Sequence, residues 1–417
     1  MKSFLKKLFR NERGNALIIA ALGMPLLIGF AGLANDTIQW SLWKRQLQRQ
    51  ADSAALAGVY ARFASQNLNT AVTNDLAKNS RTGIAFATGY PIVTPLADAA
   101  NWDRPVQVTL AVRQALPFSK FFMSTAPLIE ATAIAGGIET GEYCVVSLEN
   151  TSSTGITAGG NTNVDFGCGM ITNSVSMDAA IAFGSSQVKA TPIAAVGGLD
   201  STDNWASGTT LMPFTLPQPD PFADIDPPPI PNSGCNNFSD SPNSVTTINA
   251  KQSDGTTPTC FNNLTLKGDV TFSPGVYVIK GDMNVNSSAH IKCTGCTFVL
   301  TDDPASGTGT VDINGGAELD LSAPTEGQPY QGILFYQNRG APQTTSKING
   351  NSQSTLQGAF YFPNSQVEYT GTAGLVFNCV QLVVRRVTFM GNSKLLNNCP
   401  ANSGTPDITG HHVRLVG

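Results

Sequence analysis

The chain has 417 residues, of which 13% are charged, and its net charge is −4 at pH 7. This balance argues against a nucleic-acid partner, because Lys and Arg cluster only at the extreme N-terminus. Few charges combined with 40 Gly and 25 Pro are typical of an exported β-rich protein and fit a cytosolic enzyme poorly.

Residues 16–34, ALIIAALGMPLLIGFAGLA, form an apolar run without a single charge. At ~1.5 Å per residue, a helix of this length can cross the ~30 Å hydrocarbon core of a bilayer. Pro25 in the middle of the run would kink a helix, which membrane spans tolerate better than soluble helices do. The sequence therefore predicts a transmembrane helix over residues 16–34.

The charges that flank this run are asymmetric. The basic residues before it, opposed by Glu12 alone, are Lys2, Lys6, Lys7, Arg10 and Arg13. Asn35 and Asp36 follow the run, and no basic residue occurs until Lys44. Because an excess of Lys and Arg holds its side of a span in the cytoplasm, residues 1–15 are predicted to be a cytoplasmic basic tip. We expect a single-pass protein of the bacterial inner membrane with its bulk in the periplasm.

Two other fates of this segment compete with an uncleaved anchor. A cleaved secretory signal has a shorter apolar core, whereas this run continues directly into a helical pattern. Gly14 resembles the boundary of a type IV prepilin leader, although Ile19 occupies the position where such leaders usually carry Glu. We expect a retained anchor, with processing after Gly14 as the alternative.

Residues 36–64 are predicted to continue as a stalk helix. A stripe of apolar and small residues recurs at helical spacing, namely Trp40, Trp43, Leu47, Ala51, Ala54 and Gly58. The two tryptophans stand where the span should leave the membrane, the usual depth of an aromatic belt. The stripe is expected to pack on the protein's own domain; contact with other, pilin-like helices is the alternative.

The same segment carries a family resemblance. Arg13-Gly14, GFAGLANDTIQW (29–40) and LQRQADSAALAG (47–58) resemble the N-terminal module of TadG-like proteins of the Flp, or tight-adherence, pilus assembly system. The family-motif positions are Gly14, Asp36, Leu47, Gln48 and Asp52. The resemblance is strong over residues 10–60 and weaker over 106–122 and 129–137.

The resemblance implies a membrane-anchored, non-enzymatic accessory of pilus biogenesis. Its implied partners are other pilus-assembly components or pilin-like subunits. Some relatives carry a von Willebrand A-type domain with a D-x-S-x-S metal site, but this sequence has no such motif, and that function is not expected.

Four further regions follow the span. Residues 35–140 are predicted to hold the stalk helix and a small α+β region, with a helix near 68–80 and strands near 106–113 and 129–135. Residues 141–212 form a β-rich segment, and 213–231 contain eight prolines, typical of an extended segment. That segment is either a linker or, as we favour, a strap over a β surface.

Residues 232–417 are predicted to form a β-helix-like domain. Short strands recur between 243 and 398, each bounded by Gly, Asn, Ser or Asp. The turn–strand–turn rhythm, with Asn and Gly at the bends, favours a parallel β-helix, or solenoid. A β-sandwich is the alternative. The expected fold class is thus an N-terminal transmembrane and stalk helix followed by a mainly β periplasmic part.

All cysteines lie beyond the predicted span, and their number is even. They are Cys144, Cys168, Cys235, Cys260, Cys293, Cys296, Cys379 and Cys399. In an exported segment this favours disulfides, with sequential pairing as the default. Cys293-Thr-Gly-Cys296 together with His290 permits a metal site on paper, but no second C-x-x-C completes it, so a structural disulfide is expected.

Parallel β-helices also occur among glycosidases and lyases, whose hydrolytic members need two carboxylates ~5–9.5 Å apart. Asp302-Asp303 is the obvious pair, with Asp312 and Asp320 further along, but no nearby basic set supports catalysis. His411-His412 is expected to be part of a tail. No nucleophile-elbow, zincin or phosphate-loop motif occurs. We expect no enzyme activity, cofactor or metal; the alternative function is a surface or periplasmic carbohydrate-binding or carbohydrate-cleaving β-helix protein.

Overall fold

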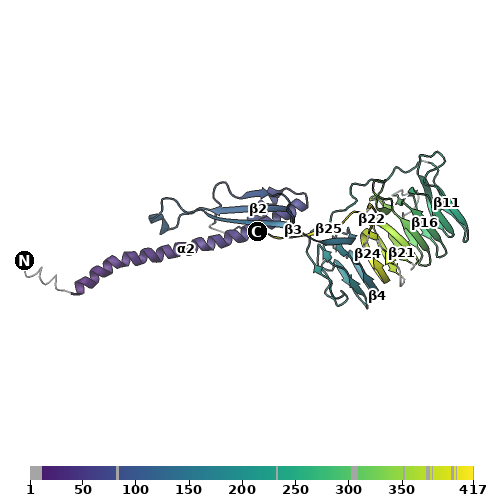
Figure 1. Cartoon of the computed structure of the whole chain (residues 1–417). Coiled ribbons are helices and arrows are strands. Elements are labelled where there is room, and N and C mark those ends of the chain that lie inside the picture. The colour runs from purple at the N-terminus through teal and green to yellow at the C-terminus, as the bar shows by residue number, and fades with distance from the viewer. Residues whose placement is uncertain are drawn as a thin grey trace, which may run out of the picture. The chain divides into compact units, whose positions relative to one another are not determined.

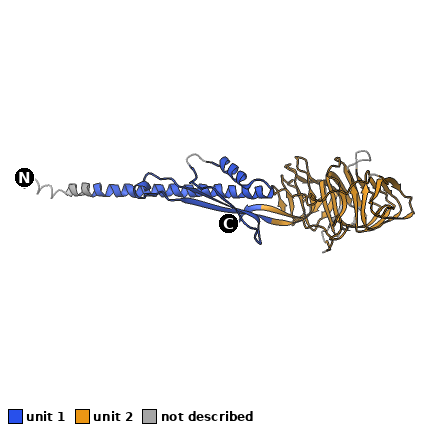
Figure 2. Cartoon of the chain, turned by 90° about the horizontal axis from the view of Figure 1, so that it is seen from above, with its two compact units in different colours: residues 1–138, 413–417 blue, residues 139–412 orange. Residues whose placement is uncertain are grey.

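A computed structural model describes the chain in several ranges. They are residues 12–80, 84–231, 233–301, 309–350, 353–371, 376–377, 379–395, 399–400 and 402–416. The chain divides into an N-terminal unit, residues 1–138 with 413–417, and a solenoid unit, residues 139–412 (Figure 2). Two sets of residues named above lie outside the described ranges: Lys2, Lys6, Lys7 and Arg10 of the basic tip, and the Asp302-Asp303 pair.

The N-terminal unit is built on one long helix, α2 Glu12–Phe63 (Figure 1). The predicted span and the predicted stalk helix are both parts of this element, and Pro25 lies inside it. The segment from Ile19 onward is long and apolar enough to cross a membrane. The expected long apolar helix is therefore confirmed.

A second helix and a small sheet pack on the later part of α2. Helix α3 Leu68–Lys78 begins where the Asn67 side chain accepts a hydrogen bond from the backbone of Thr70, 2.9 Å away. The sheet is antiparallel and consists of β1 Ile92–Pro95, β2 Asp103–Val112 and the first part of β3 Ile129–Ser147. A Cβ at Gly58 would lie 2.9 Å from Val106 and 3.0 Å from Leu68, so only glycine permits this close approach of α2 to both elements.

The solenoid unit is a parallel β-solenoid of about 10 turns, which confirms the predicted β-helix and not the β-sandwich. Successive coils pair their short strands in register, and the pairings form three stacks. The first stack consists, in spatial order, of β12 Thr259–Leu266, β14 Gly275–Ile279, β17 Cys296–Leu300, β20 Ile333–Gln337, β22 Thr355–Gly371, β24 Cys379–Leu395, β3, β5 Gly169–Thr172, β8 Ile193–Ala195 and β9 Leu211–Met212.

The longer strands belong to more than one stack: the second stack shares β12, β22 and β24 with the first, whereas the third shares only β22 and β24 and reaches β7 through β4. The second adds β10 Asn236–Ser239, β15 Met283–Val285, β18 Val311–Ile313, β21 Thr345–Gly350, β4 Ile156–Asp165 and β6 Ala180–Ala182. The third adds β11 Val245–Ile248, β13 Asp269–Phe272, β16 His290–Thr294, β19 Glu318–Ser322, β23 Val376–Phe377 and β7 Gln187–Lys189. The last strand of the chain is β25 Thr409–Leu415.

The chain enters this solenoid in its middle. Strand β24 pairs with β3, where Leu382 lies opposite Val145, and with β4, where Val387 lies opposite Ile156. From there β5 to β9 lead to one end, whereas β10 and β11 start at the other end and lead back to β24. Two regions treated as separate in the sequence therefore form one continuous stack.

An ion cluster fastens the coils where these two halves meet. Glu149 is buried, and its Oε2 lies 3.2 Å from Nε of Arg385 and 2.5 Å from Nε of Arg386. Burial acts to raise the pKa of Glu149, but hydrogen bonds from Thr151 and Arg386 outweigh it and hold the pKa below its usual value. The carboxylate is therefore ionised and tied to the neighbouring coil.

Aromatic side chains fill the interior of the solenoid. Phe298 stacks on Tyr277 and on Phe335 of the adjacent coils, with ring centroids 5.6 Å apart in both pairs. Phe272 and Phe360 add edge-to-face contacts to the same ladder. Each such pair stabilises by about 0.5–1.5 kcal/mol beyond the burial of its area.

The Pro-rich segment 213–231, called the strap below, covers the outer face of the first stack. Its Phe222 packs edge-to-face on Tyr361, with ring centroids 5.3 Å apart. Tyr361 donates a hydrogen bond to Asp220 at 2.7 Å, and Tyr336 donates one to the carbonyl of Ile225 at 2.7 Å. Because the strap covers this face, strands such as β20 are buried on both sides and read as continuous apolar runs.

Candidate functional site

The apolar half of α2 presents its large side chains outward. Between Ile19 and Phe30 the large apolar side chains are 57–70% exposed; they are Ile19, Leu22, Met24, Leu26, Leu27, Ile28 and Phe30. Such a continuous apolar surface is unfavourable in water and suits the hydrocarbon core of a bilayer. Exposure on this scale is what a span surrounded by lipid requires.

Asp36 docks another part of the N-terminal unit onto α2. Its carboxylate is buried and accepts hydrogen bonds from the backbone N–H groups of Phe118, at 3.1 Å, and Ser119, at 2.5 Å. One turn earlier, a Cβ at Gly32 would lie only 2.0 Å from the Phe118 ring. A bare glycine and a buried carboxylate therefore hold residues 118–119 against the end of the predicted span.

Gln48 and Asp52 work at the edge of the sheet. Gln48 Nε2 donates to the carbonyl oxygen of Thr132 on β3 at 3.0 Å and to Oδ1 of Asp52 at 2.8 Å. One turn earlier, Lys44 donates to the carbonyl oxygen of Glu130 on the same strand. Further along β3, the backbone of Val416 donates to Ile134 at 2.9 Å.

These donors cover the edge of β3 that faces away from β2. An uncovered edge would offer unpaired carbonyl groups to any passing strand. The side chains of one helix and the last described residue of the chain thus close the sheet.

From Trp43 onward the predicted stripe on α2 is buried within the N-terminal unit, as expected, whereas Trp40 is only partly buried. Leu47, Ala51 and Ala54 are fully buried, and Trp43 is 6% exposed. Gln50 donates to the carbonyl of Asn79 at 2.8 Å, and Ser53 donates to Asp75 at 3.0 Å, so polar neighbours of the stripe fasten α3. Leu47 is therefore a core residue of the unit.

The structure joins the cysteines as four disulfides in the solenoid unit. The pairs are Cys144–Cys168, Cys235–Cys260, Cys293–Cys296 and Cys379–Cys399, which is the sequential pairing. His290 does not join Cys293 and Cys296 in a site. Its Nδ1 lies 3.2 Å from Asp269 and its Nε2 3.8 Å from Glu318, in the two adjacent coils.

A polar groove of about 460 Å³ lies along the third stack. The charged residues that line it are Asp269, His290, Lys292, Glu318 and Asp320. Of the carboxylates that were considered from the sequence and that the structure describes, only Asp320 is placed here. Asp312 is exposed on the second stack, in register with Lys347. Sequence inspection missed Asp269 and Glu318, because only stacking brings residues of successive coils together.

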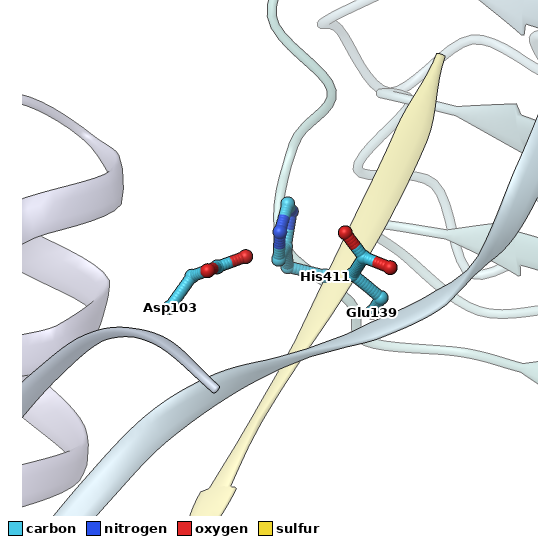
Figure 3. A group of neighbouring side chains, drawn as sticks. All are labelled: Asp103, Glu139 and His411. Carbon is cyan, nitrogen blue, oxygen red and sulfur yellow. The ribbon is translucent and has the colours of Figure 1, made fainter. Parts of the chain in front are cut away.

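The two histidines near the C-terminus are part of a strand, and the expectation of a tail is wrong for them. Both belong to β25, and Ile408, just before this strand, accepts a main-chain hydrogen bond from Tyr143 of β3. Figure 3 shows His411 beside Glu139 of β3, with ligand atoms within 4.8 Å of each other. Asp103, also labelled there, belongs to the other unit. Two side chains of one unit do not define a metal site.

Comparison with family models gives a match in the N-terminal part of the chain. Residues 14–64 match the family described as "Putative Flp pilus-assembly TadE/G-like". Comparisons of the chain with curated proteins and with solved structures find no significant match. The matched range begins at Gly14 and ends one residue after α2, so it contains the exposed span, Asp36 and the buried stripe. Residues 14–64 thus carry a TadE/G-like Flp pilus-assembly module, as the sequence resemblance predicted.

Proposed function

We propose that this protein is a membrane-anchored, non-enzymatic accessory of Flp-type pilus assembly. The observation that carries the proposal is the match of residues 14–64 on a helix whose first part is apolar and exposed and whose second part is built into a folded unit. In this proposal α2 spans the inner membrane once, with its N-terminus in the cytoplasm and the solenoid in the periplasm.

The solenoid would be the part that meets other pilus-assembly components or pilin-like subunits. Stacked coils give an extended, regular surface, which repeat folds use for binding. Four disulfides suit an oxidising compartment outside the cytoplasm. We propose a binding role for this surface and no catalytic one.

Deletion of the gene tests the pilus role. We expect loss of pili by electron microscopy and loss of surface attachment, both restored by the full-length chain. Replacing Asp36 with Ala should restore them less well, because residues 118–119 lose their docking carboxylate. Thr37→Ala, at an exposed position on the same helix, is the matched control and should restore both. Normal piliation and attachment of the deletion strain would refute the proposal.

Reporter fusions test the topology. A reporter active only in the periplasm should work when fused after residue 60 and fail when fused before residue 14. Neutral replacements of Lys2, Lys6, Lys7 and Arg10 should weaken this orientation, because the charge bias across the span would largely disappear. The reverse pattern of reporter activity would rule out a periplasmic solenoid.

A second candidate function is carbohydrate binding, which the polar groove on the third stack favours. Its charged lining offers both hydrogen-bond donors and acceptors for sugar hydroxyl groups. A glycan array probed with the detergent-solubilised full chain would show binding that Lys292→Ala and Asp320→Asn abolish. Unchanged glycan binding in both variants, or none in the parent protein, would exclude the groove as a glycan site.

A further inference from the structure

The connection between β2 and β3, residues 113–128, exposes a cluster of large apolar side chains. Phe121 is 86% exposed, Phe122 68% and Met123 43%. Such side chains side by side are unfavourable in water, whereas isolated exposed ones are common. Within the N-terminal unit this cluster therefore needs an apolar environment that the unit itself does not supply.

The connection is held at a defined depth along α2. Its Phe118 and Ser119 are docked on Asp36, which follows the apolar run by two positions. The Phe118 ring lies against Gly32, inside the run itself. Gly32 and Asp36 are one helical turn apart, or ~6 Å along the axis. If residues 16–34 span the membrane, the connection thus lies at the level where the span leaves the hydrocarbon core.

Local geometry suits this depth. The short helix η1 Ser119–Phe121 satisfies the backbone N–H groups of the cluster internally: Phe121 donates to Phe118 at 3.2 Å, Phe122 to Ser119 at 3.0 Å and Met123 to Ser119 at 2.8 Å. Backbone groups paired in this way lower the cost of entering an apolar layer. The aromatic side chains are therefore presented by a turn that needs no water to complete it.

The charges of the connection fit the headgroup layer. Residues 113–128 contain Arg113 and Lys120, both exposed, and no acidic residue. A lysine next to aromatic rings that enter a membrane can extend its ammonium group toward anionic headgroups. On α2 itself, Ile38 and Leu42 are 60% and 50% exposed just beyond the span, which continues the apolar face at this level.

We propose that the β2–β3 connection is a second membrane-contact element. Phe121, Phe122 and Met123 enter the interfacial layer of the leaflet from which the span emerges. This contact fixes the N-terminal unit at the membrane surface, where a single helix alone would let it tilt and rotate. The inference rests on the membrane span of the proposed function and is independent of any pilus role.

Site-specific labelling of the full chain in vesicles of phosphatidylcholine and phosphatidylglycerol tests the proposal. A single cysteine replaces Phe121 or, in a second variant, Phe122, and carries an environment-sensitive fluorophore; the native cysteines are disulfide-bonded. The control is Phe183→Cys, half exposed in the solenoid unit. We expect a blue-shifted emission that shallow spin-labelled lipids quench at positions 121 and 122, and water-like emission at 183.

Two results would overturn the proposal. Water-like emission at both positions would show that the cluster stays in solvent. A blue shift that lipid quenchers leave unchanged would show that protein covers the cluster, and its dependence on protein concentration would identify a second copy of the chain. If the protein still resists extraction by high salt, either result rejects membrane contact by the β2–β3 connection but leaves the proposed membrane span unaffected.

Discussion

The two units close their sheets by different means. In the N-terminal unit, one edge of β3 is covered by the side chains of Lys44 and Gln48 and by the backbone of Val416. In the solenoid unit, the strands of successive coils cover one another, and apolar side chains stack in its interior. The first arrangement depends on the chemical identity of a few polar groups. The second depends on apolar volume repeated from coil to coil.

The largest effect is expected in the aromatic ladder. Phe298→Ala removes a fully buried ring between two coils and should lower the free energy of unfolding by about 3–5 kcal/mol. Phe298→Leu keeps most of the apolar volume and should cost less than half as much. Val245→Ala, at a site 82% exposed, is the control and should change stability by less than ~0.5 kcal/mol. Chemical denaturation in detergent measures all three, and equal losses for Ala and Leu would contradict dependence on volume.

The solenoid unit, unlike the N-terminal unit, is also cross-linked by disulfides. By loop entropy, Cys235–Cys260, with a separation of 25, should stabilise by about 3.5 kcal/mol and Cys293–Cys296, with a separation of 3, by about 1.6 kcal/mol. Double Cys→Ala variants of each pair, compared by denaturation, should reproduce this order. The reverse order would indicate that native-state contacts, and not loop length, set the contribution of each pair.

A substitution of Asp36 tests the N-terminal unit, whose arrangement depends on the chemical identity of a few polar groups. Asp36→Ala leaves the N–H groups of Phe118 and Ser119 without their acceptor and should cost about 1–3 kcal/mol, although it removes almost no apolar area. Hydrogen exchange at these two amides should accelerate, while exchange in the solenoid stays the same. Thr37→Ala serves as the control, and unchanged exchange at residues 118 and 119 in Asp36→Ala would contradict the docking role.

The smallest expected effect is the loss, at acidic pH, of the stabilisation that Glu149 provides. Because the pKa of Glu149 in the folded protein lies below the unfolded value of 4.5, its ion cluster stabilises fully above that value. This contribution is lost as the pH falls through the lower, folded pKa. Melting temperatures of the parent and of Glu149→Gln should therefore converge on acidification below pH 4.5. A difference that stays constant with pH would contradict a lowered pKa.

The contrast between the units also explains what the sequence could reveal. The apolar run, its flanking charges and the stripe from Trp43 to Gly58 are local patterns on one helix, so the helix and its buried face could be predicted. The hydrogen bonds of Asp36 and Gln48 could not be predicted, because their partners at residues 118, 119 and 132 are distant in the sequence. The family motif identifies these two residues but does not show which segments they bind.

The fold class of the solenoid could be predicted from the sequence, but the order in which its strands stack could not. Short strands with Gly and Asn at the bends indicated stacked coils, yet the aromatic rings that contact each other at residues 277, 298, 335 and 360 follow no fixed period. Nothing local shows that β24 pairs with β3 and β4, so entry of the chain in the middle could not be read from the sequence. For the same reason the groove residues Asp269, His290 and Glu318 became neighbours only in the folded stack.

We have proposed that α2 anchors the chain in a membrane and that the solenoid lies in an oxidising compartment beyond it. Trapping of free thiols in rapidly acidified cells, with a maleimide that adds visible mass, tests it directly. We expect no mass shift of the full-length protein before reduction and modification of all eight cysteines after reduction. Modification of all eight cysteines without reduction would place the solenoid in the cytoplasm and rule out this arrangement.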